Sequence, residues 1–205
     1  MPLIKYNNQS LSALTELPAA IPTGKLKLIS SQTASNSASI SFTSGLDSTY
    51  KVYKFVFVNM HPASDNVNFQ FNMSTDSGSN YNVTKTTTAF RTFHNESDST
   101  ANLSYDTGSD IAQGTGFQFI SPSIGNENDE SASGELTIFN PSSTTYVKHF
   151  ISRLNDVHEQ PASVDWYVAG YANTTSAVNA VQFSMSSGNI SAGTIYLYAI
   201  DNSWV

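Results

Sequence analysis

The sequence predicts an all-β protein, a jelly-roll-like antiparallel β-sandwich of two sheets that follows an extended N-terminal arm. Short runs of alternating apolar and polar residues recur along the chain, and turn residues separate them. Charged residues make up only 12% of the 205 residues, so Ser, Thr and Asn provide much of the polar surface. These short side chains favour strands and turns over helices. A chain of this length fits one sandwich with a sizeable core.

The first 24 residues differ from the rest of the chain and are expected to form the arm. Pro18 and Pro22 lack amide hydrogens and resist regular strand pairing. The apolar residues here follow no sustained period, which indicates anchors that dock either on the chain's own domain or on a neighbouring subunit. We therefore divide the chain into an arm, 1–24, and a β-sandwich domain, 25–205. The docking residues expected in the arm are Leu3, Ile4, Leu11, Leu14, Leu17 and Ile21.

Eleven strands are expected after the arm. Residues 67–73 alternate strictly between apolar and polar, which predicts a half-buried strand. Residues 52–58 are nearly all apolar, which predicts a strand buried on both faces. The predicted strands are 25–30, 38–42, 50–59, 66–73, 81–93, 116–120, 134–139, 146–153, 164–172, 177–183 and 193–200.

Turn chemistry supports this division into strands. The stretches 76–80 and 186–189 are rich in Ser, Asn and Gly and are expected to link strands. The segment 93–116 is long and polar and could hold a short helix. The stretch 121–133 contains five acidic residues or their amides in a row, 126–130, and is expected to form an exposed acidic loop.

Charge and composition exclude several classes of partner. The net charge is −7 with only nine Lys and Arg residues, too few to neutralise many phosphates or to bind an anionic membrane. The chain has no cysteine, so neither a disulfide framework nor a thiolate metal site can form. The N-terminus lacks a basic region followed by an apolar one, so no signal peptide is expected. Neither nucleic acid nor membrane is expected as a partner.

Motifs that could carry chemistry are weak. No histidine sits in a nucleophile motif, so no catalytic residue, no metal ligand and no cofactor is assigned. Oxygen ligands for calcium occur at Asp76, Asn80 and 126–130, but they do not follow the EF-hand spacing. Glu135 and Asp165 are the best candidates for a pair of glycosidase carboxylates, although both suit ordinary solvent-facing strand positions.

Aromatic residues could provide stacking faces for a sugar, because jelly-rolls also serve as lectins. The candidates for glycan binding or for an interface are Trp166, Tyr171 and Trp204. Packing in the core or at a subunit contact is the preferred interpretation of these aromatic residues.

Three stretches resemble a family of structural proteins from tailed bacteriophages, especially marine and cyanobacterial ones. They are the arm from Asn7 to Gly24, the run from Tyr50 to Pro62 followed by Asp76-Ser77-Gly78 and Tyr81, and the ending from Ile190 to Ile200. The resemblance spans most of the chain, but the family often has Gly where Ala199 stands. It implies a β-sandwich of the virus particle and brings no catalytic residues with it.

The function expected from this resemblance is that of a non-enzymatic virion structural protein, a capsid decoration or cement protein that binds neighbouring subunits. A tail or fibre component that binds a receptor or carbohydrate is the alternative. The expected partners are other virion proteins, in the capsid or the tail, and further copies of the chain, with a trimer as one arrangement. The protein would be made in the host cytoplasm and reside in the phage particle.

Overall fold

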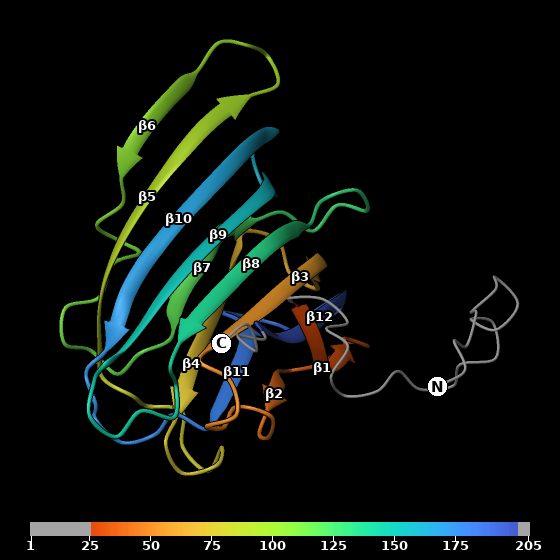
Figure 1. Cartoon of the computed structure of the whole chain (residues 1–205). Coiled ribbons are helices and arrows are strands. Elements are labelled where there is room, and N and C mark those ends of the chain that lie inside the picture. The colour runs from red at the N-terminus through yellow and green to blue at the C-terminus, as the bar shows by residue number, and fades with distance from the viewer. Residues whose placement is uncertain (1–25, 201–205) are drawn as a thin grey trace, which may run out of the picture.

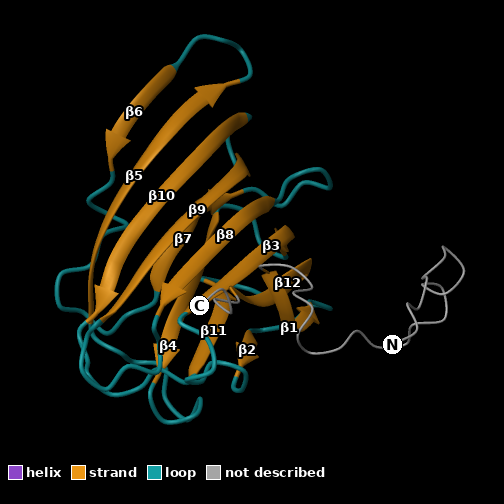
Figure 2. Cartoon of the chain, viewed as in Figure 1, coloured by secondary structure: helices purple, strands orange, loops and turns teal. Residues whose placement is uncertain are grey.

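The computed structural model describes residues 26–200, and these form twelve antiparallel strands. All twelve belong to one hydrogen-bonded sheet that curls into a nearly closed, barrel-like shape (Figure 1). The all-β antiparallel part of the prediction is therefore confirmed, and Figure 2 shows strands and loops only. The strands are β1 (Leu26–Thr33), β2 (Ile40–Phe42), β3 (Val52–Pro62), β4 (Val67–Ser74), β5 (Lys85–Asn95), β6 (Ala101–Tyr105), β7 (Gln118–Ile124), β8 (Ala132–Phe139), β9 (Lys148–His158), β10 (Ala162–Ala172), β11 (Ala180–Met185) and β12 (Ile190–Ile200).

The strands follow one another in two rows. A long row runs β1-β12-β3-β8-β9-β10-β5-β6, and a short row runs β2-β11-β4-β7. Strand pairing between the two rows is limited to one residue pair, Ile124 of β7 with His158 of β9. In Figure 1 the strands β4, β7 and β11 lie behind the broad surface formed by β8, β9, β10 and β5.

Aromatic side chains fill the core. Phe183 of β11 is fully buried, and its ring centroid lies 5.0 Å from that of Phe55 and 5.1 Å from that of Phe57, both on β3. Phe69 of β4 meets Phe57 edge to face at 5.2 Å. Such pairs contribute about 0.5–1.5 kcal/mol each beyond the area they bury. Phe183 thus links the short row of strands to the long row.

Three sequence predictions are corrected by the structure. The strand at 52–62 buries one face only, because Val52, Lys54 and Val56 point outward and remain partly exposed. The polar segment 93–116 holds β6 rather than a helix, since residues 101–105 pair with β5. The predicted acidic loop begins later than expected, because β7 extends to Ile124.

The remaining acidic loop is not wholly exposed either. The Glu130 side chain is buried and its carboxylate accepts a hydrogen bond of 2.6 Å from the backbone amide of Glu127. The predicted turns are present. Ser77 and Gly78 between β4 and β5, and Gly188 between β11 and β12, adopt positive φ angles.

Candidate binding surface

The side of β8, β9, β10 and β5 that is turned away from the core forms the candidate surface, here called the outer face. Residues paired across antiparallel strands share a face of the sheet. Ile151 of β9 pairs with Ala169 of β10, and Ala169 pairs with Thr88 of β5. Ile151 is 55% exposed, although it is a large apolar residue in the middle of a sheet. The outer face therefore presents apolar area to solvent at its centre.

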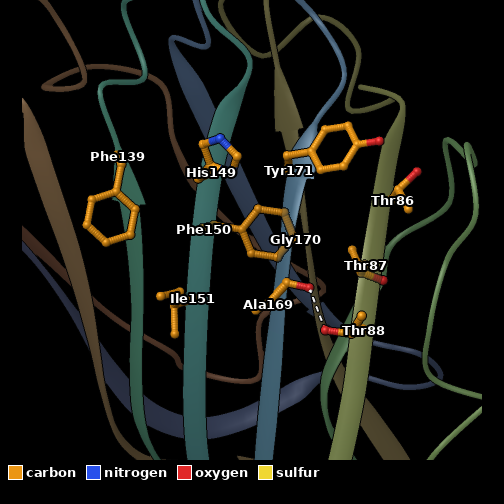
Figure 3. A pocket seen from close by; sticks show the side chains of 10 residues that line it. All are labelled: Thr86, Thr87, Thr88, Phe139, His149, Phe150, Ile151, Ala169, Gly170 and Tyr171. Carbon is orange, nitrogen blue, oxygen red and sulfur yellow. Dashed lines mark hydrogen bonds between the residues drawn. The ribbon is translucent and has the colours of Figure 1, made fainter.

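An open pocket of about 480 Å³ lies on this face (Figure 3). The small side chain of Ala169 leaves the middle of the pocket shallowly filled, while Phe139, Ile151 and Tyr171 line its walls. Thr86, Thr88 and His149 add polar groups at the rim. The ring of His149 lies 6.2 Å from that of Tyr171. The pocket is suited to bind an apolar side chain of a partner.

Beside the pocket, a row of stacked side chains crosses the strands. The Phe90 ring lies parallel to the Tyr167 ring, with centroids 4.7 Å apart. The Arg153 guanidinium covers the Tyr167 ring at 5.0 Å. Arg153 also donates to both carboxylate oxygens of Asp165, with Nε–Oδ1 at 3.2 Å and Nη2–Oδ2 at 2.7 Å. A bidentate pair of this kind fixes the position of both side chains.

Hydrogen bonds complete the row and shift its pKa values. The Tyr167 hydroxyl donates to Oδ2 of Asp165 at 3.0 Å. This bond raises the pKa of Tyr167, and the ion pair with Asp165 raises the pKa of Arg153. Because Phe90 and Arg153 cover the two faces of the Tyr167 ring, this aromatic residue offers no free face for stacking on a sugar.

A second, more polar pocket of about 610 Å³ adjoins the row. Glu135, Arg153, Asn155 and Asp165 contribute its polar groups. Glu135 accepts a hydrogen bond of 2.8 Å from Nζ of Lys54. Both carboxylates proposed as a glycosidase pair are thus on the outer face, and each is held in an ion pair. The outer face changes from apolar at Ile151 to polar at this pocket.

The three aromatic residues selected from the sequence differ in where they lie and whether they are exposed. Tyr171 forms a wall of the apolar pocket. Trp166 points to the opposite side of β10 and is fully buried, so it presents no ring face to a ligand. Trp204 lies outside the described residues. The predicted docking residues of the arm, Leu3, Ile4, Leu11, Leu14, Leu17 and Ile21, lie outside them as well.

Sequence reasoning did not anticipate the buried polar cluster beneath the outer face. Asp156 of β9 is 1% exposed and accepts a short hydrogen bond from the hydroxyl of Ser121 on β7. Burial raises the pKa of Asp156 to about 7, and the bond from Ser121 opposes this rise. The Arg91 guanidinium lies 5.2 Å from the centre of the Trp166 ring, and its positive charge also lowers the pKa of Asp156.

His158 is near this cluster, but it does not connect Ser121 to Asp156. Its Nδ1 accepts a hydrogen bond of 3.1 Å from the backbone amide of Gln160, and its ring packs edge to face on Phe93. Burial lowers the pKa of His158. Since the Ser121 hydroxyl bonds directly to Asp156, the three side chains do not form a Ser–His–Asp relay. No sequence motif surrounds Ser121, so its contact with Asp156 could not be predicted from the sequence.

Two of the calcium candidates, Asp76 and Asn80, are engaged in local hydrogen bonds. One carboxylate oxygen of Asp76 accepts from the Ser74 hydroxyl at 2.6 Å, and the other accepts from the Asn80 amide at 2.7 Å. These bonds lower the pKa of Asp76 to about 2. Among residues 26–200 no three His, Asp or Glu side chains lie close enough together to hold a metal ion.

No protein-family model, curated protein or solved structure matches this chain. No helix within residues 26–200 is long and apolar enough to cross a bilayer.

Proposed function

We propose that this chain is a non-enzymatic structural protein of a tailed-phage particle, a capsid decoration or cement protein that binds neighbouring subunits through the apolar centre of its outer face. The observation that carries the proposal is the exposed apolar centre of the outer face. A large apolar patch on a sheet is typical of a protein-binding site, whereas single exposed apolar residues are ordinary. Here Phe139 and Ile151 line one pocket together with Ala169 and Tyr171.

The order of the strands supports a jelly-roll classification, which virus shells share. If β5, β6, β9 and β10 are set aside, the rows become β1-β12-β3-β8 and β2-β11-β4-β7. Along the chain from β1 to β12, the remaining strands alternate between the two rows except at β4 and β7, which follow one another in the short row, as expected of a jelly-roll. The four strands set aside lengthen one row, and three of them, β5, β9 and β10, carry the outer face together with β8.

The chemistry of the two pockets favours a protein ligand over a sugar. Sugar sites need an exposed aromatic face and several convergent hydrogen-bonding groups. The apolar pocket has few polar groups, and in the polar pocket Glu135 and Asp165 already pair with Lys54 and Arg153. A receptor-binding role in a tail or fibre is therefore the second choice.

Substitution on the outer face tests this function. Ile151→Asp places a charge at the centre of the patch, where a bound subunit would have to desolvate it. We expect the variant to fold, because Ile151 is exposed, and to be lost from purified particles of the phage that encodes the chain. Quantitative mass spectrometry of these particles measures the loss.

Ser163→Asp is the matched control, since Ser163 lies on the same face of β10 near its far end and is also exposed. We expect this variant to be incorporated as the wild-type chain is. Equal incorporation of both variants, or absence of the wild-type chain from particles, would contradict the proposed function.

A further inference from the structure

The strand β6 forms a free edge at one end of the long row. It pairs with β5 and with no other strand among residues 26–200. All five of its residues are exposed, with Leu103 at 69% and Tyr105 at 52%. In Figure 1 the β5–β6 hairpin extends beyond the strands of the short row. Both faces of β6 and its outer backbone edge are thus accessible.

The sequence of β6 lacks the features that usually prevent edge strands from pairing. Charged residues, prolines and bulges normally protect an exposed edge. The strand reads Ala-Asn-Leu-Ser-Tyr, and its pairing with β5 continues without a register shift from Ala101 to Tyr105. At the other end of the row, β1 contains Lys27 and a register shift between Leu28 and Ser30. One edge is therefore protected, and the other is suited to accept a strand.

We propose that β6 pairs with β6 of a second copy of this chain, antiparallel about a two-fold axis, so that the two long rows become one continuous sheet. This inference goes beyond the proposed function, because it concerns the isolated protein and needs no particle. It also yields a dimer, whereas the sequence considered a trimer. A two-fold axis makes the same patch serve both partners, so the strand must be complementary to itself.

The sequence of β6 meets this requirement when the axis passes beside Leu103. The two Leu103 side chains then lie directly opposite each other. Each Tyr105 faces the small Ala101 of the second copy, so that a large side chain meets a small one. On the other face, Asn102 lies opposite Ser104, and both can form hydrogen bonds. Cross-strand pairs of these kinds stabilise antiparallel sheets.

Acidic residues limit the pairing to these five positions. Glu96 and Asp98 lie in the turn before β6, and Asp106 and Asp110 lie after it. In the proposed register Thr100 of one copy faces Asp106 of the other. The turn that carries Glu96 and Asp98 precedes Thr100, so acidic groups of the two copies approach each other at both ends. Since salt screens such repulsion, association should strengthen as ionic strength rises.

Sedimentation equilibrium of the full chain tests the proposal, in about 0.15 M and about 0.5 M NaCl. We expect a dimer at about 100 µM, with tighter association in the higher salt. Leu103→Lys, which places two like charges beside the axis, should weaken the dimer by more than about tenfold. Leu28→Lys is the control, because Leu28 is an exposed leucine of similar accessibility on the opposite edge strand, and it should leave the dimer unchanged.

Cross-linking tests the register independently, because the natural chain contains no cysteine. Opposed residues of an antiparallel pair have Cα atoms about 4.5–5.5 Å apart, which a disulfide can span. Under mild oxidation Leu103→Cys should form a disulfide-linked dimer, and Leu28→Cys should not. A monomer at every concentration, a dimer that tolerates Leu103→Lys, or equal cross-linking of both cysteine variants would overturn the proposal.

Discussion

At the scale of single residues, the most unusual feature of the strands is that some charged side chains are buried in the interior. Lys85 and Lys148 are fully buried, and each donates to backbone carbonyls, with Lys85 Nζ 2.6 Å from the oxygen of Gly116. Burial lowers the pKa of Lys85 to about 8. Asp156 is the acidic counterpart, with its pKa raised to about 7. Each group makes the stability of the fold depend on pH.

Asp156 gives the clearest prediction of this kind. Its pKa in the folded chain lies above the ordinary value of 3.8, so the folded state retains a proton that the unfolded state releases. The stabilisation from this carboxyl is complete below pH 3.8, declines as pH rises and is absent above about pH 7. The shift corresponds to roughly 4 kcal/mol. Asp156→Asn removes this titration, so the free energy of unfolding of the variant minus that of the wild-type chain should rise between pH 4 and about 7.

Urea unfolding at several pH values measures this difference. The comparison with the wild-type chain cancels other titrating groups, among them His158, whose lowered pKa acts in the opposite direction. Asp65→Asn is the control, because Asp65 is exposed in the loop between β3 and β4. A difference between Asp156→Asn and the wild-type chain that does not change with pH would contradict the assignment.

At the scale of elements, β9 shows why some strands could not be oriented from the sequence. Its inward side carries Lys148, Ser152 and Asp156 among apolar residues, while Ile151 and Val157 point outward. The alternation expected of a half-buried strand is therefore blurred. By contrast, β4 alternates strictly from Val67 to Phe71 and was predicted nearly to its ends.

The bulged strand pair β3–β12 contains a glycine that the fold is expected to require. Gly193 has a φ of +119°, and a Cβ atom there would lie 2.6 Å from the carbonyl oxygen of Asn59 and 2.9 Å from Cα of Met60. Register shifts in both strands surround this contact. Gly193→Ala should therefore lower the free energy of unfolding by about 2–3 kcal/mol.

Thermal or urea unfolding measures this loss, and Gly116→Ala is the matched control. Nothing lies within 4 Å of a Cβ atom at Gly116, so its substitution should change stability by less than about 0.5 kcal/mol. Equal effects of the two substitutions would show that the close approach at Gly193 does not constrain the fold.

At the scale of the whole molecule, the sequence predicted the all-β class and most strand positions but not the neighbours of each strand. Local alternation reports which face is buried, whereas pairing depends on contacts between distant segments. The outer face was missed for this reason. The sequence singled out Tyr171, Glu135 and Asp165 separately. Phe139 and Ile151 form an apolar patch with Tyr171 only because β8, β9 and β10 lie side by side.

The outer face and the β6 edge lie on the same extended part of the long row. Phe90 of β5 pairs with Tyr105 of β6, so the stacked row that includes Tyr167 continues to the free edge. One copy could thus bind a second copy through β6 and still offer its apolar pocket to another subunit. Repetition of such contacts over a particle would sum many modest interactions.

An image of the intact phage particle by electron cryo-microscopy tests the central claim most directly. We predict density for this chain on the particle, with Phe139, Ile151 and Tyr171 covered by a neighbouring subunit. Density in which these three side chains face open solvent, or a particle that lacks the chain altogether, would contradict the claim.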